Sequence, residues 1–538
     1  MSQSPNNVLT IRGLRVAAPN GAILVDGIDV DLAPGEVLGL IGESGAGKST
    51  IGLAAMGYGR GGCRIIGGSI EIGGTSLMDG SRATREAMRG ARIAYVAQSA
   101  AAAFNPAIRI GEQIIEGALY HGKMSRPEAE AWKLELLKTL QLPNPETFGE
   151  RYPHQVSGGQ LQRAMVAMAM SCRPDIIVLD EPTTALDVTT QIEVLALLRS
   201  LIQRYNTSAL YITHDLAVVA QIANRIMVLR HGKLVEEGTA EQVLEAPRED
   251  YTRMLVAERR GNLVGEASGR QIGDVLLDVS GVHAYYGKTA VLDDISCTLR
   301  RGETLAVVGE SGSGKSTLAR AIAGLMPTSA GMISFDGRRL DRSYKQRTRE
   351  ELRRIQLVYQ LPDVALNPRQ TVGEIIGRPM KFYFGMYDVP KEKAVARLLD
   401  LIGLPQDFAG RLPGALSGGQ KQRVCIARAL AAKPDLIICD EVTSALDPLV
   451  AEDILRLLKS LQGELGLSYL FITHDLGVVR RLADRTVVMQ RGRIVEQGPT
   501  AEIFQPPFHP YTEELVTSVP ELRRDWLDDV LAKRQITA

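Results

Sequence analysis

The sequence predicts an α/β protein built from two homologous domains, and three observations support this fold class. At 538 residues the chain is too long for one ordinary core. A set of short motifs occurs twice in the same order: Gly42 to Gly309 is an offset of 267 residues, and Ser157 to Ser417 is an offset of 260. Continuous apolar runs precede several motifs, as is typical of strands buried on both faces of a parallel sheet.

The repeat sets the expected domain boundaries. Residues 1–256 form the first copy, residues 257–274 a linker, and residues 275–538 the second copy with a C-terminal extension. The linker is rich in Arg, Gly, Glu and Ser, and as a flexible coil it would span roughly 25 Å. It is too short to hide another domain, and two long copies do not make a solenoid.

The composition is that of an ordinary soluble protein. Hydrophobic residues make up 45% and charged residues 23%, which excludes wholesale disorder. Lys plus Arg number 62 and Asp plus Glu also 62, so the balance argues against a dedicated nucleic-acid coat. The five cysteines are scattered without a C-x-x-C pair, which favours neither a zinc site nor disulfides and fits a reducing compartment.

Membrane and export signals are also missing from the sequence pattern. It contains no run of about 18 apolar residues. The first ten residues are polar and lack the apolar stretch of a signal peptide. We therefore expect a cytosolic chain that reaches a membrane only through a partner.

The first repeated motif is a glycine-rich loop between a strand and a helix. Apolar runs at Val37–Ile41 and Leu305–Val308 precede the pattern G-x-x-x-x-G-K-[ST]. Such glycines let backbone N–H groups surround phosphate oxygens at a helix N-terminus. In this pattern Lys reaches the β- and γ-phosphates of ATP and Ser ligates Mg²⁺. The candidate ATP-binding residues here are Gly42, Glu43, Ser44, Gly45, Ala46, Gly47, Lys48, Ser49, Thr50, Gly309, Glu310, Ser311, Gly312, Ser313, Gly314, Lys315, Ser316 and Thr317.

The second repeated motif is a pair of acids at a strand end. Asp180 and Asp440 end apolar strands and are expected to hold Mg²⁺, directly or through water. Glu181 and Glu441 follow, and each is placed to accept a proton from the attacking water. The alternative is a structural carboxylate that caps the next turn.

The third motif places a histidine after another apolar strand in each copy. His214 follows the run 209–212 and His474 follows the run 469–472. An imidazole there could contact the γ-phosphate and orient the water. A lone histidine would more often be a satisfied polar residue, but two Thr-His-Asp sequences favour the catalytic interpretation.

Amphipathic helices are expected between the two halves of each copy. One carries Trp132, Leu136, Leu137 and Leu140, and the other carries Val395, Leu398, Leu399 and Ile402. The favoured interpretation of these residues is an ordinary helix face turned toward the core.

Together these motifs resemble the ATP-binding cassette (ABC) ATPases over nearly the whole chain, twice. Two further motifs of that family are present: a Gln after a strand (Gln98, Gln360) and Ser-Gly-Gly-Gln. The resemblance implies P-loop cassettes, each with a RecA-like parallel-sheet core, an antiparallel β subdomain and a helical subdomain. It also implies ATP and Mg²⁺ as ligands. The additional ATP-binding candidates are Gln98, Ser157, Gly158, Gly159, Gln160, Gln360, Ser417, Gly418, Gly419 and Gln420.

The resemblance further implies two composite ATP sites in a head-to-tail sandwich of the cassettes. The first would combine Lys48, Gln98, Asp180, Glu181 and His214 with Ser417, Gly418 and Gly419, and the second would combine Lys315, Gln360, Asp440, Glu441 and His474 with Ser157, Gly158 and Gly159. The metal ligands would be Ser49, Gln98, Asp180, Ser316, Gln360 and Asp440.

Departures from the family pattern are mild. Tyr286 stands where the family stacks an aromatic ring on adenine, whereas the first copy has Ala18, so weaker binding is expected there. Val156 replaces a leucine, and Val442 stands where the first copy has Pro182. No catalytic group is missing, so both sites are expected to hydrolyse ATP.

Two features resemble the ATPases of oligopeptide, dipeptide and nickel importers. They are an Asn-Pro pair after each Gln (Asn105-Pro106, Asn367-Pro368) and the run Pro507–Thr512, of which the first copy keeps Tyr251-Thr252-Arg253. As isolated pairs, Asn-Pro and His-Pro are common turns. The resemblance implies a peripheral motor on the cytoplasmic face of the inner (plasma) membrane, with two transmembrane permease subunits docking near Gln98 and Gln360. An extracytoplasmic solute-binding protein would deliver a peptide or peptide-like solute.

The competing interpretation is a soluble twin-cassette ATPase that acts on ribosomes or DNA. The run Arg338–Arg354 favours it, with eight basic and three acidic residues, although a solvated helix face explains such a run more often. The short linker and the absence of zinc-binding cysteines oppose it. A drug exporter is a third option, but such exporters usually carry their own membrane helices. No nucleic-acid partner is expected.

Overall fold

The computed structural model describes residues 7–183, 186–261, 272–444, 446 and 448–537, and it divides into two compact units. The first unit contains Met1–Gly261 together with Pro520–Ala538, and the second contains Asn262–Val519. The repeat predicted that the second domain extends to the end of the chain. The structure instead groups the last residues with the first unit, for reasons given below.

The core of the first unit is a six-stranded sheet in which every neighbouring pair is parallel except the edge pair β10–β9. Every residue of β3, β7 and β8 is buried, as the continuous apolar runs predicted. The strand order is β10 (Lys233–Thr239), β9 (Arg225–Arg230), β3 (Val37–Ile41), β8 (Ser208–Ile212), β7 (Ile176–Asp180) and β6 (Ile93–Val96).

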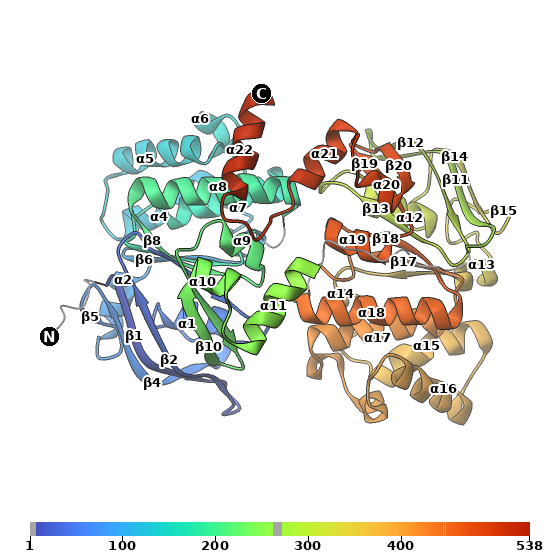
Figure 1. Ribbon diagram of the computed structural model, residues 1–538, viewed down its shortest axis with the longest axis horizontal. Helices are drawn as coiled ribbons and strands as arrows, with labels where there is room; N and C mark the ends of the chain where they lie inside the picture. The colour runs from blue at the N-terminus through green and yellow to red at the C-terminus, as the bar shows by residue number, and fades with distance from the viewer. Residues whose placement is uncertain (1–6, 184–185, 262–271, 445, 447, 538) are drawn as a thin grey trace. The chain divides into compact units, whose positions relative to one another are not determined.

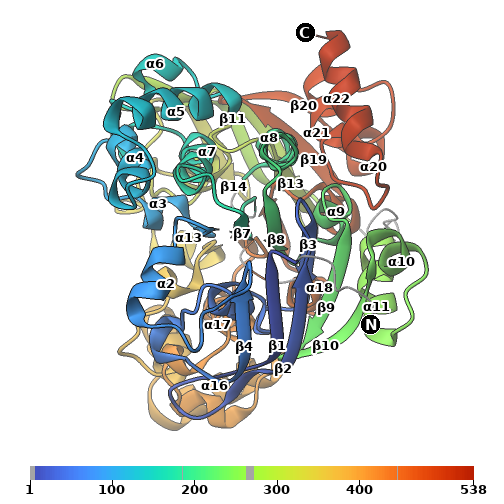
Figure 2. The same ribbon diagram turned by 90° about the vertical axis from the view of Figure 1, so that its left-hand side faces the viewer.

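An antiparallel sheet and a group of helices complete the first unit. The sheet shares one hydrophobic cluster with the core strands, and Figure 2 shows β1, β2 and β4 lying together beside β3, β8 and β9. Its order is β2 (Ile23–Leu32), β1 (Leu9–Ala17), β4 (Arg64–Ile72) and β5 (Thr75–Ser76). The helical subdomain contains α4 (Ile110–Tyr120), α5 (Arg126–Thr139) and α7 (Gly158–Ala169).

The second unit repeats this arrangement, which confirms the predicted α/β fold class. Its six-stranded sheet runs in the order β16 (Ile355–Val358), β17 (Leu436–Asp440), β18 (Ser468–Ile472), β13 (Thr304–Val308), β19 (Arg485–Gln490) and β20 (Arg493–Pro499). Its antiparallel sheet runs in the order β12 (Thr289–Arg300), β11 (Val275–Tyr286), β14 (Ala330–Phe335) and β15 (Arg338–Arg339). Its helical subdomain contains α15 (Val372–Phe384), α16 (Asp388–Leu401) and α17 (Gly418–Leu430).

Further helices complete both units (Figure 1). In the first unit they are α1 (Lys48–Ala54), α2 (Arg82–Met88), α3 (Ala100–Ala103), α6 (Pro145–Phe148), α8 (Val188–Tyr205), α9 (Leu216–Ala220), α10 (Ala240–Glu245), α11 (Asp250–Gly261), α22 (Trp526–Thr537) and the 3₁₀ turns η1 (Arg60–Gly62) and η2 (Pro153–Gln155). In the second they are α12 (Lys315–Ile322), α13 (Arg349–Arg354), α14 (Pro362–Ala365), α18 (Pro448–Leu465), α19 (Leu476–Leu482), α20 (Thr500–Ile503), α21 (Pro510–Thr517), η3 (Gln406–Gly410) and η4 (Pro413–Ala415). Within the described ranges, none of the helices is long and apolar enough to cross a bilayer.

The two predicted amphipathic helices are α5 and α16, and both turn their apolar face inward. Trp132, Leu136 and Leu137 of α5 are buried. Val395 and Leu399 of α16 are buried, while Leu398 packs partly buried against the same core. The core-facing interpretation of these residues is confirmed.

The C-terminal segment, residues 520–537, belongs to the first unit because a buried glutamine binds it. Gln221 follows α9, and its amide Nε2 donates to the carbonyls of Glu521 (2.7 Å) and Arg523 (2.9 Å). Its Oε1 accepts from the N–H of Leu527 at 3.1 Å. Trp526 and Leu527 are buried. A single side chain thus satisfies three backbone groups of this segment, and burial of two large apolar residues holds it in place.

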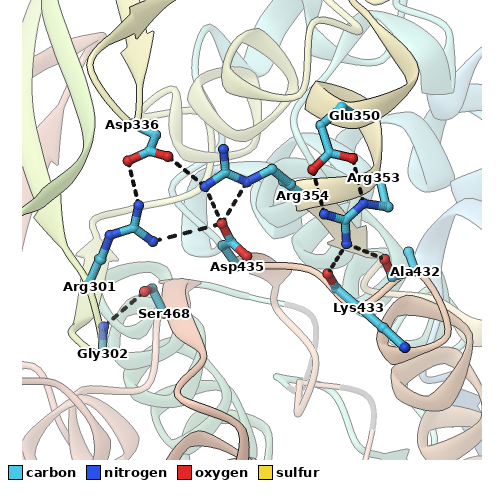
Figure 3. A network of polar contacts seen from close by, with 10 residues as sticks. All are labelled: Arg301, Gly302, Asp336, Glu350, Arg353, Arg354, Ala432, Lys433, Asp435 and Ser468. Atoms are coloured by element: carbon cyan, nitrogen blue, oxygen red, sulfur yellow. Dashed lines mark hydrogen bonds and ion pairs between the residues drawn. The ribbon is translucent and has the colours of Figure 1, made fainter.

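Two arginines at the end of the basic run make contacts inside the second unit (Figure 3). Arg354 pairs with Asp336 and Asp435, and Arg353 donates to the carbonyls of Ala432 and Lys433. These contacts tie α13 to the end of β14 and to the turn before β17. Arginines that are satisfied by their own chain give no support to a nucleic-acid interface.

Candidate active site

The glycine-rich loop of each unit leaves no room for a side chain at its first position. Gly42 has φ +152°, and a Cβ there would lie 2.1 Å from the carbonyl oxygen of Leu229. Gly309 has φ +148°, and its Cβ would lie 2.2 Å from the carbonyl oxygen of Met489. Only glycine tolerates both the backbone angle and the close approach. The loop is therefore pressed against the neighbouring strand end, where it leads into α1 or α12.

The lysine of each loop is buried and folds back over the loop. The ammonium of Lys48 donates to the carbonyls of Gly42 (2.6 Å) and Glu43 (2.9 Å). The ammonium of Lys315 makes the equivalent bonds to Gly309 and Glu310, each 2.7 Å long. A buried cation on a glycine-rich loop at a helix N-terminus is suited to bind phosphate oxygens.

A serine–aspartate pair lies beside each lysine. The Ser49 hydroxyl donates to Asp180 Oδ1 at 2.8 Å, and the Ser316 hydroxyl donates to Asp440 Oδ1 at 2.9 Å. Burial raises the pKa of both aspartates. Hydroxyl and carboxylate oxygens fit Mg²⁺, which usually takes one or two protein ligands and completes its shell with water and phosphates. The described residues contain no cluster of three or more His, Cys, Asp or Glu side chains that could hold a metal.

The glutamate after each aspartate is oriented by an amide and an imidazole. In the first unit Gln98 Nε2 donates to Glu181 Oε2 at 2.6 Å, and His214 Nδ1 lies 3.0 Å from Glu181 Oε1. Glu181 has φ +50°, a left-handed conformation that is uncommon for a residue with a side chain. Backbone strain of this kind is found preferentially at functional sites.

The second unit repeats this geometry. Gln360 Nε2 donates to Glu441 Oε2 at 2.7 Å, His474 Nδ1 lies 3.5 Å from Glu441 Oε1, and Glu441 also has φ +50°. Burial alone would raise the pKa of Glu441, but His474 and Lys315 outweigh it, and the pKa falls below its usual value. Glu441 is therefore ionised at neutral pH and able to accept a proton.

The same contacts raise the pKa of both histidines. Burial disfavours the imidazolium form, but the hydrogen bond and charge of Glu181 outweigh it and raise the pKa of His214. Glu441 raises the pKa of His474 in the same way. Each glutamate thus stabilises the charged form of its histidine.

The Ser-Gly-Gly-Gln loops begin α7 and α17. The Ser157 hydroxyl accepts from the N–H of Gln160, and Ser417 does the same with Gln420, each at 3.3 Å. Gly159 is required by packing, since its Cβ would lie 2.6 Å from the side chain of Thr190. Ser157, Gly158, Ser417 and Gly418 are exposed. Each loop therefore presents a helix N-terminus at the surface of its own unit.

The remaining sequence predictions have simpler outcomes. Asn105 and Asn367 each accept from the N–H two residues further on, at 3.0 Å, so the Asn-Pro pairs are turns. Tyr286 is 52% exposed at the end of β11, and its hydroxyl accepts from Arg320 at 3.4 Å. Its ring is accessible, as an adenine platform requires.

The contacts of three tyrosines were not predicted from the sequence, although two of these residues lie in motifs noted above. The hydroxyl of Tyr95 donates to Asp180 Oδ2 at 2.5 Å, whereas Leu357 occupies the same strand position in the second unit. The hydroxyls of Tyr251 and Tyr511 reach the glycine-rich loops. Comparing the two copies residue by residue would have revealed the Tyr95–Leu357 difference, but not the partner of either side chain.

Comparisons with known proteins give two matching family descriptions. "ABC transporter" matches residues 25–184 and 292–444, and "Oligopeptide/dipeptide transporter, C-terminal region" matches residues 495–537. The glutathione import ATP-binding protein GsiA of Salmonella choleraesuis is 39% identical, and that of Escherichia coli K12 is 38% identical. Each alignment covers 96% of this chain and 90% of the relative. Among solved structures, cbiO1 of Clostridium perfringens, part of the ABC transporter complex cbiONQ, covers 49% of this chain and 100% of its own, with 30% identity and a TM-score of 0.40.

Proposed function

The chain belongs to the ABC transporter family, and on this premise we propose that its two cassettes form two composite ATP sites, each completed by the Ser-Gly-Gly-Gln loop of the other cassette. The protein is an ATPase coupled to transport, the motor subunit of an importer, and it works with membrane permease partners. The observation that carries the proposal is the oriented glutamate beside a buried lysine and a serine–aspartate pair, found in both units.

Exposure of the Ser-Gly-Gly-Gln loops supports the composite arrangement. Ser157 and Ser417 each stand at a helix N-terminus with the following glycine exposed. A serine hydroxyl, glycine N–H groups and a helix N-terminus together suit a γ-phosphate. In the proposed sandwich the first site takes Ser417, Gly418 and Gly419, and the second takes Ser157, Gly158 and Gly159.

The geometry of the glutamates suggests how water is activated. Glu181 would take a proton from the attacking water as it approaches the γ-phosphate, while Gln98 and His214 hold the carboxylate in place. Glu441, Gln360 and His474 would do the same in the second site. Ser49, Asp180 and Gln98, and likewise Ser316, Asp440 and Gln360, would hold Mg²⁺, which neutralises charge on the β- and γ-phosphates.

Exposed apolar side chains beside Gln360 support the proposal of a docking partner. Leu361 and Val364, next to Gln360 on and before α14, are 52% and 83% exposed. Exposed apolar side chains that lie close together can form part of an interaction site. We propose that cytoplasmic helices of two transmembrane permease subunits dock beside Gln98 and Gln360, and that the chain acts as a peripheral subunit on the cytoplasmic face of the inner (plasma) membrane.

The proposed cargo is a short peptide or peptide-like solute, delivered by an extracytoplasmic solute-binding protein. Support comes from the match to the oligopeptide/dipeptide C-terminal region and from relatives named for glutathione import. The test is mass spectrometry of proteins that co-purify with the tagged full chain after gentle solubilisation. Two multi-spanning membrane proteins with a solute-binding protein are expected. Ribosomal proteins or DNA-repair factors in their place would overturn the importer.

A further inference from the structure

The Pro-Tyr-Thr motif near the C-terminus reaches the glycine-rich loop of its own unit. Tyr511 begins α21 and is 4% exposed, and its hydroxyl accepts from the backbone N–H of Glu310 at 3.0 Å. The first unit repeats this contact. Tyr251 is 7% exposed, and its hydroxyl accepts from the N–H of Glu43 at 3.3 Å. The contact occurs twice, which makes it a constant feature of both loops.

The N–H that each tyrosine binds belongs to the peptide group whose carbonyl binds the lysine. Lys315 donates to the carbonyl of Gly309, and Tyr511 accepts from the N–H of Glu310, so one peptide plane is held at both ends. Lys48 and Tyr251 hold the Gly42–Glu43 peptide in the same way. Because a peptide group is planar and rigid, fixing its N–H also fixes the carbonyl that receives the ammonium.

The tyrosines are themselves held in place. Thr512 donates a hydrogen bond to Glu496 of β20, which anchors the start of α21 to the edge of the core sheet. In the first unit the guanidinium of Arg230 lies over the ring of Tyr251, 4.6 Å from its centroid. Burial, together with the charge of Glu43, raises the pKa of Tyr251, so its hydroxyl stays protonated. A fixed hydroxyl can restrain the loop, whereas a mobile one could not.

We propose that Tyr251 and Tyr511 are positioning residues of the two ATP sites, which hold the peptide that seats Lys48 or Lys315. This inference rests on the proposed function of those sites. The tyrosines act through the loop, because their hydroxyls bind its backbone N–H groups. The C-terminal motif is thereby part of the ATP-binding machinery, as well as a feature of the importer subfamily.

The expected consequence is a loss of nucleotide affinity. Removing one neutral hydrogen bond that preorganises a site weakens binding by roughly two- to tenfold. The tyrosine holds the loop in the same way when ATP binds and when ATP reacts. Its removal should therefore weaken ground-state and transition-state binding by the same factor. The KM for ATP should rise by the same factor while kcat changes little.

The test compares Tyr251→Phe, Tyr511→Phe and the double variant with Tyr469→Phe in the full chain. Tyr469 is equally buried, and its hydroxyl donates to the carbonyl of Leu458 at 3.0 Å, away from the loop. ATP and ADP affinities are measured by calorimetry, with steady-state ATPase rates and melting temperatures in parallel. The double variant should bind both nucleotides two- to tenfold more weakly, and Tyr469→Phe should bind normally even where its melting temperature falls.

Two results would overturn the proposal. One is unchanged affinity in the double variant. The other is an equal loss in Tyr469→Phe, which would trace the effect to general destabilisation. A wild-type chain that binds no ATP would overturn the proposed function as well, and that outcome is recognised before any variant is made.

Discussion

The two units carry the same proposed catalytic groups but support them differently. Asp180 receives hydrogen bonds from Ser49 and Tyr95, whereas Asp440 receives one from Ser316, and Leu357 fills the tyrosine's position. In the second unit Arg301 and Asp336 extend the Arg354–Asp435 pair into a network (Figure 3). The equivalent pair of the first unit is Arg92–Asp175, at 2.6 Å.

The C-terminal segment adds a third difference. It binds to Gln221 of the first unit, whereas the corresponding position of the second unit is Arg481, which pairs with Glu452. The lysine, glutamate, glutamine and histidine are thus matched, while the residues around them differ. Duplicated domains can exchange supporting contacts freely as long as the geometry of the reacting groups is preserved.

The largest effect is expected from replacing the two glutamates, which tests whether both sites hydrolyse ATP. Glu181→Gln and Glu441→Gln keep the size of each side chain but remove the group that accepts the proton. Loss of such a base costs about 10²- to 10⁴-fold at its own site. Each single variant should therefore lose nearly all of the steady-state ATPase rate that its own site contributes. An unchanged rate in either variant would show that its site is not hydrolytic.

The second effect concerns the C-terminal segment. Gln221→Ala leaves two carbonyls and one N–H of that segment without their partner, which should destabilise its docking by about 2–3 kcal/mol. Hydrogen exchange is the measurement. Amides of α22 should exchange faster, while those of the core strand β18 should not. The exposed variant Glu193→Ala on α8 serves as a control, and equal rates in α22 for both variants would contradict the assignment.

The third effect concerns Tyr95. Second-sphere hydrogen bonds to a metal ligand typically contribute 10- to 100-fold to metal affinity. Tyr95→Phe should therefore weaken Mn²⁺ binding to the ATP-loaded first site by about tenfold, as measured by electron paramagnetic resonance. Leu357→Phe is the matched control in the second unit, because it adds a ring without a hydroxyl. Unchanged Mn²⁺ affinity in Tyr95→Phe would show that the Tyr95 hydroxyl does not support Asp180 as a metal ligand.

The smallest effect concerns the arginine network. Arg354 and Arg301 lower the pKa of Asp336. The ionised carboxylate therefore stabilises the fold at pH values above its ordinary pKa. This stabilisation is lost as the pH falls through the lowered pKa. Because Asp336 is partly exposed, the loss should stay below about 1 kcal/mol. Asp336→Asn should remove this part of the acid sensitivity of the second unit. The measurement is thermal unfolding of both proteins at several values between pH 7 and pH 3. An identical pH profile would exclude the contribution.

The sequence alone determined the α/β fold class and the duplication, and it predicted the catalytic groups that we propose. These follow from local signals. Apolar runs predict buried strands, and β3, β7, β8, β13, β17 and β18 lie where they were expected. Gly42 is required by a backbone angle and a steric contact that no other residue tolerates. The Asp-Glu and Thr-His-Asp motifs stand at strand ends, where their chemistry is typical.

Tertiary structure decided which distant groups support that chemistry. Tyr251 and Tyr511 lie more than 200 residues from the loops they bind, and Gln221 lies 300 residues from Glu521. A buried tyrosine or glutamine has the same local pattern whatever its partner. The partner is chosen only when packing brings two segments together, because a hydrogen bond depends on distance and angle, which motif spacing does not encode.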